Sequence, residues 1–224
     1  MRKILLLITC ALISSVGAFG AACGSTGDLL SDYISLGSCT ITGTDLTFSG
    51  WDYTISGNSI PIPASDVTVT PVTGSEEGGF VFNAPWVALS PDLLDADITY
   101  TVTCDGCDID DWALAMGGVG LTGDAFADVG ETSPEVSAPL GVGATATLSQ
   151  LTDSASFAPV GSLSVDKDLT IYGGTKQGAI VSKVSSITNL FSTTATTMTP
   201  EPSLAILCIV AVGLIPLARR RLVR

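Results

Sequence analysis

Apolar and polar side chains alternate in short runs along most of the chain, which is the pattern of β-strands with one buried face. The clearest run extends from Asp97 to Cys104, where every even-numbered residue is apolar. Another run, residues 45–55, changes phase at Gly50, which predicts a β-bulge there. Further runs that we expect to form strands are residues 67–72, 79–89, 109–115, 144–148, 160–165, 169–172 and 179–187.

Turn signals containing glycine separate these runs, and a helical period is absent apart from one short candidate at residues 28–36. Many short strands at regular intervals are typical of antiparallel sandwiches and barrels. We therefore predict an all-β fold for residues 23–191, an antiparallel β-sandwich of the jelly-roll kind. A body of this size buries enough surface to fold without a metal.

The first residues have the pattern of a secretory signal peptide. Arg2 and Lys3 precede the apolar run 4–16, and small residues follow it. We assign residues 1–22 to this signal, with cleavage by signal peptidase after Gly20 or after Ala22. The run is short for a membrane span, which argues against an uncleaved anchor.

A second apolar segment, residues 203–218, stands near the other end of the chain and predicts one transmembrane helix. Arg219, Arg220 and Arg221 follow directly, and guanidinium groups are costly to move through hydrocarbon. The cluster should therefore stay on the cytoplasmic side, while the signal peptide exports the body.

The motif Pro200-Glu201-Pro202 precedes this apolar segment. Its order and spacing with the helix and the arginine cluster resemble the PEP-CTERM sorting signal of exported bacterial proteins, over residues 200–224. The resemblance implies recognition by an exosortase, which would cut near the motif and deliver the body to the cell surface or the extracellular matrix. A plain membrane anchor with a Pro-rich hinge is the alternative. Residues 192–199, rich in Ser and Thr, are interpreted as a linker or else a final edge strand.

Charge and composition narrow the function classes. Lys and Arg number 9 against 22 Asp and Glu, for a net charge of −13, and most basic residues lie at the two ends. An acidic body repels phosphate backbones, so we expect no nucleic-acid partner. The chain contains no histidine, which excludes Ser-His-Asp and Cys-His nucleophile systems and the usual zinc hydrolase sites.

Four cysteines remain when Cys10 in the signal and Cys208 in the tail are set aside. An even number in an exported chain indicates disulfides, and three pairings are open. We favour Cys23–Cys39 and Cys104–Cys107 over a redox pair, because a thioredoxin-like setting is absent, and over a zinc site at Cys104 and Cys107, because Cys23 and Cys39 are the only thiols left to complete it.

The densest acidic cluster combines Asp105, Asp108, Asp110 and Asp111 beside Trp112. Such carboxylates could hold Ca²⁺ or serve as an acid/base pair on a sugar, but the spacing matches no calcium loop. We interpret the cluster as a solvated turn and expect no metal or cofactor. Trp51, Trp86 and Trp112 are expected in the core rather than in a glycan-binding site.

The sequence thus predicts a non-enzymatic exported surface or matrix protein, sorted at its C-terminal signal. A carbohydrate-binding module for exopolysaccharide is the alternative from a second class. A glycosidase using Asp108 and Asp110 is a third hypothesis.

Overall fold

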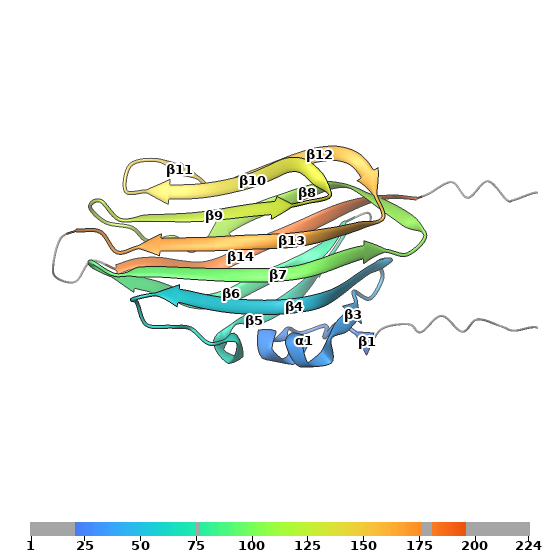
Figure 1. Ribbon diagram of the computed structural model, residues 1–224, viewed down its shortest axis with the longest axis horizontal. Helices are drawn as coiled ribbons and strands as arrows, with labels where there is room; N and C mark the ends of the chain where they lie inside the picture. Colours follow the sequence, from blue (N-terminus) through green and yellow to red (C-terminus); the bar gives the residue numbers. More distant parts are fainter. Residues whose placement is uncertain (1–20, 75–76, 176–180, 196–224) are drawn as a thin grey trace, which may run out of the picture.

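The computed structural model describes residues 21–74, 77–175 and 181–195. They form two packed β-sheets, one short α-helix and one 3-10 turn, so the predicted all-β sandwich is confirmed (Figure 1). Apart from the short parallel pair at the N-terminal edge, neighbouring strands run antiparallel.

The larger sheet has eight strands. In spatial order they are β1 (Ala21–Ala22), β3 (Ser38–Thr40), β4 (Leu46–Gly57), β7 (Leu93–Cys104), β13 (Ser162–Tyr172), β9 (Phe126–Ser133), β10 (Val136–Thr145) and β11 (Ser149–Gln150).

The smaller sheet has six strands. In spatial order they are β12 (Thr152–Val160), β8 (Cys107–Gly117), β14 (Val181–Ala195), β6 (Glu77–Leu89), β5 (Thr68–Thr73) and β2 (Asp28–Leu29). The helix α1 (Leu30–Leu36) follows β2, and the 3-10 turn η1 (Ala64–Asp66) precedes β5.

Most consecutive long strands lie in opposite sheets, so the chain passes repeatedly across the sandwich. β7 and β13 are adjacent although they are far apart in sequence, and β14 lies between β8 and β6. The inner faces of both sheets bury the apolar residues of each alternating run. An aromatic cluster fills one part of this core, with Phe48 and Phe80 centroids 4.6 Å apart and Trp51 and Tyr100 centroids 4.8 Å apart.

The phase change predicted in β4 is confirmed. Gly50 has a φ of 65°, and the register between β4 and β7 shifts between Ser49 and Asp52. Because one residue is added there, Phe48 and Trp51 both point into the core. A side chain at Gly50 would be strained in this left-handed conformation.

Three sequence expectations for the strands need correction. The strand expected at residues 144–148 is wrong, because β10 ends at Thr145 and a turn follows. β9 and most of β10 were not expected, since small or polar residues such as Ala127, Glu131 and Ser133 hold inward positions on β9 and interrupt the apolar pattern. The segments 160–165 and 169–172 belong largely to one strand, β13, which also contains the charged residues between them.

The end of the body also differs from expectation. β14 continues to Ala195, so residues 192–195 pair with β8 and do not belong to the expected linker. The expected short helix near residues 28–36 is present as α1. In the part of the chain that the structure describes, no helix is long and apolar enough to cross a membrane. The transmembrane helix expected at 203–218 lies outside the described residues.

Candidate functional site

The outer face of the larger sheet carries a set of acidic side chains that we call the acidic face. It arises from strand alternation, because each inward apolar residue of β7 and β13 is followed by an outward polar one. Strand register places these residues in rows, for example Thr54, Asp97 and Asp168 on β4, β7 and β13. The acidic face consists of Asp52, Asp95, Asp97, Asp128, Asp166 and Asp168.

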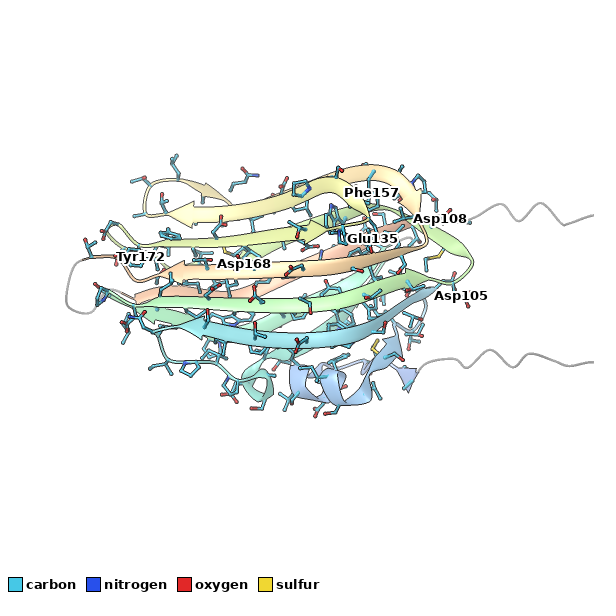
Figure 2. All side chains as sticks on the ribbon, in the orientation of Figure 1. Asp105, Asp108, Glu135, Phe157, Asp168 and Tyr172 are labelled. Carbon is cyan, nitrogen blue, oxygen red and sulfur yellow. A yellow bond between two sulfur atoms is a disulfide. The ribbon has the colours of Figure 1, made fainter. Side chains whose placement is uncertain are left out.

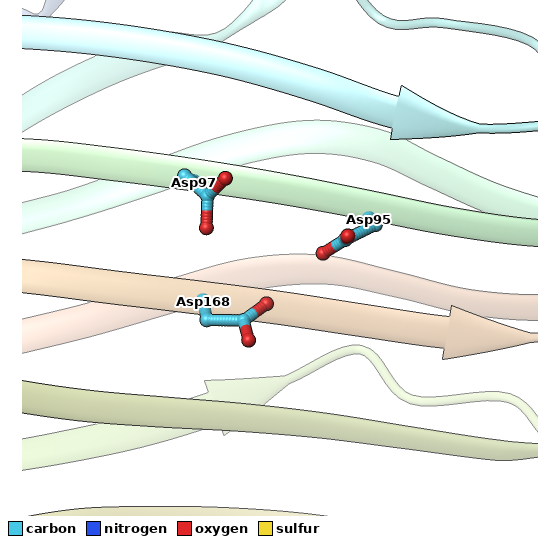
Figure 3. Close-up of side chains that lie close together, drawn as sticks. All are labelled: Asp95, Asp97 and Asp168. Carbon is cyan, nitrogen blue, oxygen red and sulfur yellow. The ribbon is translucent and has the colours of Figure 1, made fainter.

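Asp95, Asp97 and Asp168 converge at the centre of this face (Figure 3). One oxygen from each carboxylate lies within 4.8 Å of the other two. The pKa of Asp168 is raised from 3.8 to about 6, mainly because the carboxyl group is partly buried. A hydrogen bond with Asp95 and repulsion from the charges of Asp95 and Asp97 raise it further. Asp168 therefore gains or loses a proton at a mildly acidic pH.

Hydroxyl groups on the adjacent strand β4 donate hydrogen bonds to two of these carboxylates. Thr54 Oγ1 donates to Asp97 Oδ2 at 3.0 Å, and Ser56 Oγ donates to Asp95 Oδ2 at 3.0 Å. Carboxylate oxygens of this kind are ligands that Ca²⁺ prefers. Three carboxylates fall short of the six to eight oxygens that Ca²⁺ takes, and nothing else in the described residues marks the group as a metal centre.

The acidic cluster singled out in the sequence lies elsewhere. Asp105 occupies the turn after β7, and Asp108 lies at the start of β8, both at the opposite end of the sandwich from Tyr172 (Figure 2). Asp110 and Asp111 follow along β8, where Ser156 and Ser192 donate hydrogen bonds to Asp111. Among the described residues, these four do not form a group of converging metal-ligand atoms.

A groove of about 820 Å³ lies beside the acidic face, over β9 and β10. Phe126 is 37% exposed, and its ring packs against Tyr172 at a centroid distance of 5.6 Å. Asp128 supplies a carboxylate whose pKa is raised by partial burial. The remaining lining is Ala127, Gly141, Gly143, Ala144, Thr145, Leu148, Ser149, Gln150 and Thr170.

All three tryptophans lie in the core, as expected. Trp86 and Trp112 are fully buried, and Trp51 is 6% exposed. Trp112 Nε1 donates to the Ala138 carbonyl oxygen at 3.0 Å. Trp112 is therefore a packing residue and does not present its ring to a ligand.

Sequence reasoning missed a polar cluster in the core, formed by Tyr100, Glu131, Lys167 and Asn189. Lys167, Glu131 and Asn189 are fully buried, and Lys167 pairs with Glu131 across β13 and β9. Asn189 projects from β14 in the opposite sheet and accepts hydrogen bonds from Lys167 Nζ and from the Tyr100 hydroxyl. A signal was available, because Lys167 is in phase with the buried residues Leu163, Val165, Leu169 and Ile171.

The structure contains the two predicted disulfides, Cys23–Cys39 and Cys104–Cys107. The first joins the segment after β1 to β3, and the second closes the turn between β7 and β8. Both ends of the described body lie near these disulfides, since Ala21 pairs with Cys39 and Ala195 with Cys107 (Figure 1). The motif Pro200-Glu201-Pro202 and the arginines at 219–221 lie outside the described residues.

Comparison with known proteins gives distant likenesses. No family model matches the chain, and no curated protein matches it. One similar solved structure is the enzymatically active domain of bacteriophage CBA120 tailspike protein 4, with 15% identity, a TM-score of 0.27, and coverage of 63% of this chain and 19% of that chain. Another is TmCBM61 in complex with β-1,4-galactotriose, with 7% identity, a TM-score of 0.28, and coverage of 64% and 88%. At these scores neither likeness bears on what this chain does.

Proposed function

We propose that the chain is an exported cell-surface or extracellular-matrix protein whose β-sandwich is delivered by residues 1–22 and sorted through residues 200–224. The observation that carries the proposal is the pair of disulfides, Cys23–Cys39 and Cys104–Cys107, because disulfides persist in oxidising compartments outside the cytosol. The tail supplies the sorting signal, which consists of the Pro-Glu-Pro motif, the apolar segment and the arginine cluster.

The arrangement of the body is suited to such a tether. β1 and the end of β14 leave the sandwich at one end, beside both disulfides, while the groove lies over the other end of β9 and β10 (Figure 1). A body attached through its C-terminal tail would keep the acidic face and the groove free for the surroundings. Signal peptidase and an exosortase are the partners that process it.

The pairing of β1 supports cleavage after Gly20 rather than after Ala22. Ala21 and Ala22 pair with Cys39 and Thr40 in the larger sheet. Cleavage after Gly20 keeps this pair of residues in the body, whereas cleavage after Ala22 removes them. N-terminal sequencing of the mature protein should therefore read Ala21 first, and a start at Cys23 would contradict this choice.

Sorting is tested in a bacterium that carries an exosortase and in the same strain without it. We expect the mature protein of the first strain to lack Arg224 and that of the second to retain it in the membrane fraction. A variant with alanine at Pro200, Glu201 and Pro202 should behave in the first strain as the wild type does in the second. Mature protein that keeps Arg224 in the presence of the exosortase would refute the proposal.

Carbohydrate binding is the second candidate function, and the groove is the observation that favours it. An exposed aromatic ring, Phe126, stands beside the carboxylate of Asp128 and the amide of Gln150. Rings stack on the apolar face of a sugar, while carboxylates and amides accept or donate hydrogen bonds to its hydroxyls. The exopolysaccharide of the producing cell is the expected ligand.

Binding is measured with purified exopolysaccharide by calorimetry. A Cβ added at Gly141 meets no atom within 4 Å, so Gly141→Val should narrow the groove without disturbing the sheet and should weaken binding. Phe126→Ala should weaken it several-fold, because the exposed ring no longer packs on the apolar face of the sugar. Ile60→Ala changes a 70% exposed residue that does not line the groove and is the matched control. Binding that is unchanged in both Gly141→Val and Phe126→Ala would exclude the groove as the binding site.

A further inference from the structure

The buried polar cluster brings an amine, a carboxamide and a carboxyl group into mutual contact. Lys167 on β13 and Glu131 on β9 come from the larger sheet, and Asn189 on β14 comes from the smaller one. All three are fully buried. Lys167 Nζ contacts Glu131 Oε2 and lies 3.2 Å from Asn189 Oδ1. The amine is therefore next to the carbonyl group of an amide, with a proton carrier beside it.

Hydrogen bonds fix the orientation of that amide. Asn189 Nδ2 donates to the Ala113 carbonyl oxygen at 3.0 Å, and Oδ1 accepts from the Tyr100 hydroxyl and from Lys167. A flipped amide would place Oδ1 against the Ala113 carbonyl oxygen, with two acceptors and no proton between them, so the observed orientation is the one the network allows. The Tyr100 hydroxyl and Lys167 both polarise the carbonyl bond whose carbon is Asn189 Cγ.

The surroundings favour uncharged forms of the acid and the amine. Burial raises the pKa of the Glu131 carboxyl and lowers the pKa of the Lys167 amine, although their mutual attraction opposes both shifts. Within the described residues, Glu131 Oε1 has no hydrogen-bond partner, which disfavours the carboxylate further. A proton passed from Nζ to Glu131 leaves a lone pair on the amine. Burial also raises the pKa of Tyr100 well above its usual value of 10.0, so its hydroxyl keeps its proton.

We propose that Lys167 and Asn189 form an intramolecular amide cross-link, with Glu131 as the catalytic proton carrier. Lys167 Nζ attacks Asn189 Cγ, and the carbonyl electrons move to Oδ1, where the Tyr100 hydroxyl stabilises the negative charge. Glu131 takes a proton from Nζ and delivers one to Nδ2. The Cγ–Nδ2 bond then breaks and releases ammonia, leaving a Cγ–Nζ amide bond and a protonated Glu131. The reaction needs no oxidant, reductant or cofactor.

Aminolysis of an amide is slow in water, but the fold removes the main obstacles. Groups held in contact react with effective molarities of about 10⁵–10⁸ M. The reaction also needs to occur only once per molecule, after the two sheets have packed. The product would join β13 of the larger sheet to β14 of the smaller one, the strand from which the C-terminal tail leaves.

The deciding measurement is peptide mass analysis of the full chain, produced by export and digested after reduction. A protease that cuts after aromatic residues separates the two partners, because Tyr172 lies between them and Phe157 and Phe191 flank them. We expect one linked pair, residues 158–172 with 173–191, lighter than the sum of its free peptides by one ammonia. Recovery of both peptides unlinked from folded protein would overturn the proposal.

Variants identify the roles of the residues. Lys183→Ala removes an exposed lysine on β14 and should leave the linkage complete. Lys167→Ala should abolish both the linkage and the ammonia loss. If ammonia were still lost in Lys167→Ala, it would come from another reaction, such as cyclisation of Asn189, and this result would refute the cross-link. Glu131→Gln should leave the two peptides unlinked, and if it links as fully as the wild type, Glu131 is not the proton carrier. Should Glu131→Gln fail to fold, Tyr100→Phe tests the same site, with slower linkage expected than in the wild type.

Discussion

Lys167 and Asp168 are neighbours on β13, yet they point to opposite faces of the larger sheet and experience opposite surroundings. Lys167 is fully buried and contacts the carboxyl of Glu131 on the next strand. Asp168 is exposed and faces Asp97 across the β7 pairing, with Asp95 close by (Figure 3). The inner cluster combines an acid and an amine in the core, whereas the outer one combines like charges at the surface.

This difference shows how environment decides the energetic weight of a charge. Inside the sandwich, solvent cannot compensate a lost partner, so each group depends on the others. On the acidic face, water and the hydroxyls of Thr54 and Ser56 moderate the repulsion among carboxylates. Residues next to each other in sequence should therefore respond very differently to substitution.

The largest expected effect is at the inner cluster. Lys167→Ala removes the amine, and with it the proposed link to Asn189, and leaves Glu131 buried without its partner, so the free energy of unfolding should fall by about 3–5 kcal/mol. Urea denaturation followed by tryptophan fluorescence measures this. Replacing both Lys167 by Met and Glu131 by Leu should recover only part of the loss, because the buried acid is no longer left without its partner but the cross-link is still missing. If Lys167→Ala were as stable as the wild type, the buried groups would not depend on one another for stability.

A smaller effect is expected at Asp168, and its sign depends on pH. The folded state raises its pKa from 3.8 to about 6, so between those values the folded protein binds more protons than the unfolded chain. The free energy of unfolding should therefore fall as pH rises through this window and level off above it. Because the group is exposed, we expect about 1 kcal/mol or less.

Asp168→Asn removes this titration and should flatten the pH dependence between pH 4 and 7, measured as denaturation midpoints. Stability of the variant at pH 7 should equal or slightly exceed that of the wild type, since like charges on facing strands are destabilising by about 0.2–1 kcal/mol. High salt should narrow the difference between them. An unchanged pH profile would show that Asp168 titrates normally.

The smallest effect is expected at Lys183, the exposed counterpart of Lys167. Its side chain projects from β14 into solvent, so Lys183→Ala should change the free energy of unfolding by no more than about 0.5 kcal/mol. The same denaturation assay provides the comparison with Lys167→Ala. If Lys183→Ala and Lys167→Ala lowered the free energy of unfolding equally, the buried and exposed lysines would not differ in their importance for stability.

Alternation predicted the sandwich, the bulge at Gly50 and the burial of the tryptophans, because large apolar residues report directly on the core. It failed where polar residues occupy inward positions. Lys167, Glu131 and Asn189 were not singled out in the sequence, although each is in phase with buried neighbours on its strand. Their partners come from other strands, and pairing between distant strands cannot be obtained from local periodicity.

The acidic residues show the same limit. Asp105, Asp108, Asp110 and Asp111 are close in sequence, but a strand spaces its residues widely and places successive ones on opposite faces. Asp95, Asp97 and Asp168 gather instead because β7 and β13 are paired in register. The groove was also beyond sequence reasoning, since glycines and one exposed ring shape it.

The position of β14 has a mechanical consequence. This strand leads to the tail, and it is bonded along most of its length to β6 on one side and β8 on the other. Tension on its last residue loads two ladders at the same time, and their hydrogen bonds lie across the direction of pull. Such ladders resist as a group rather than opening one by one, which is the strand placement best suited to a chain that is held by one end.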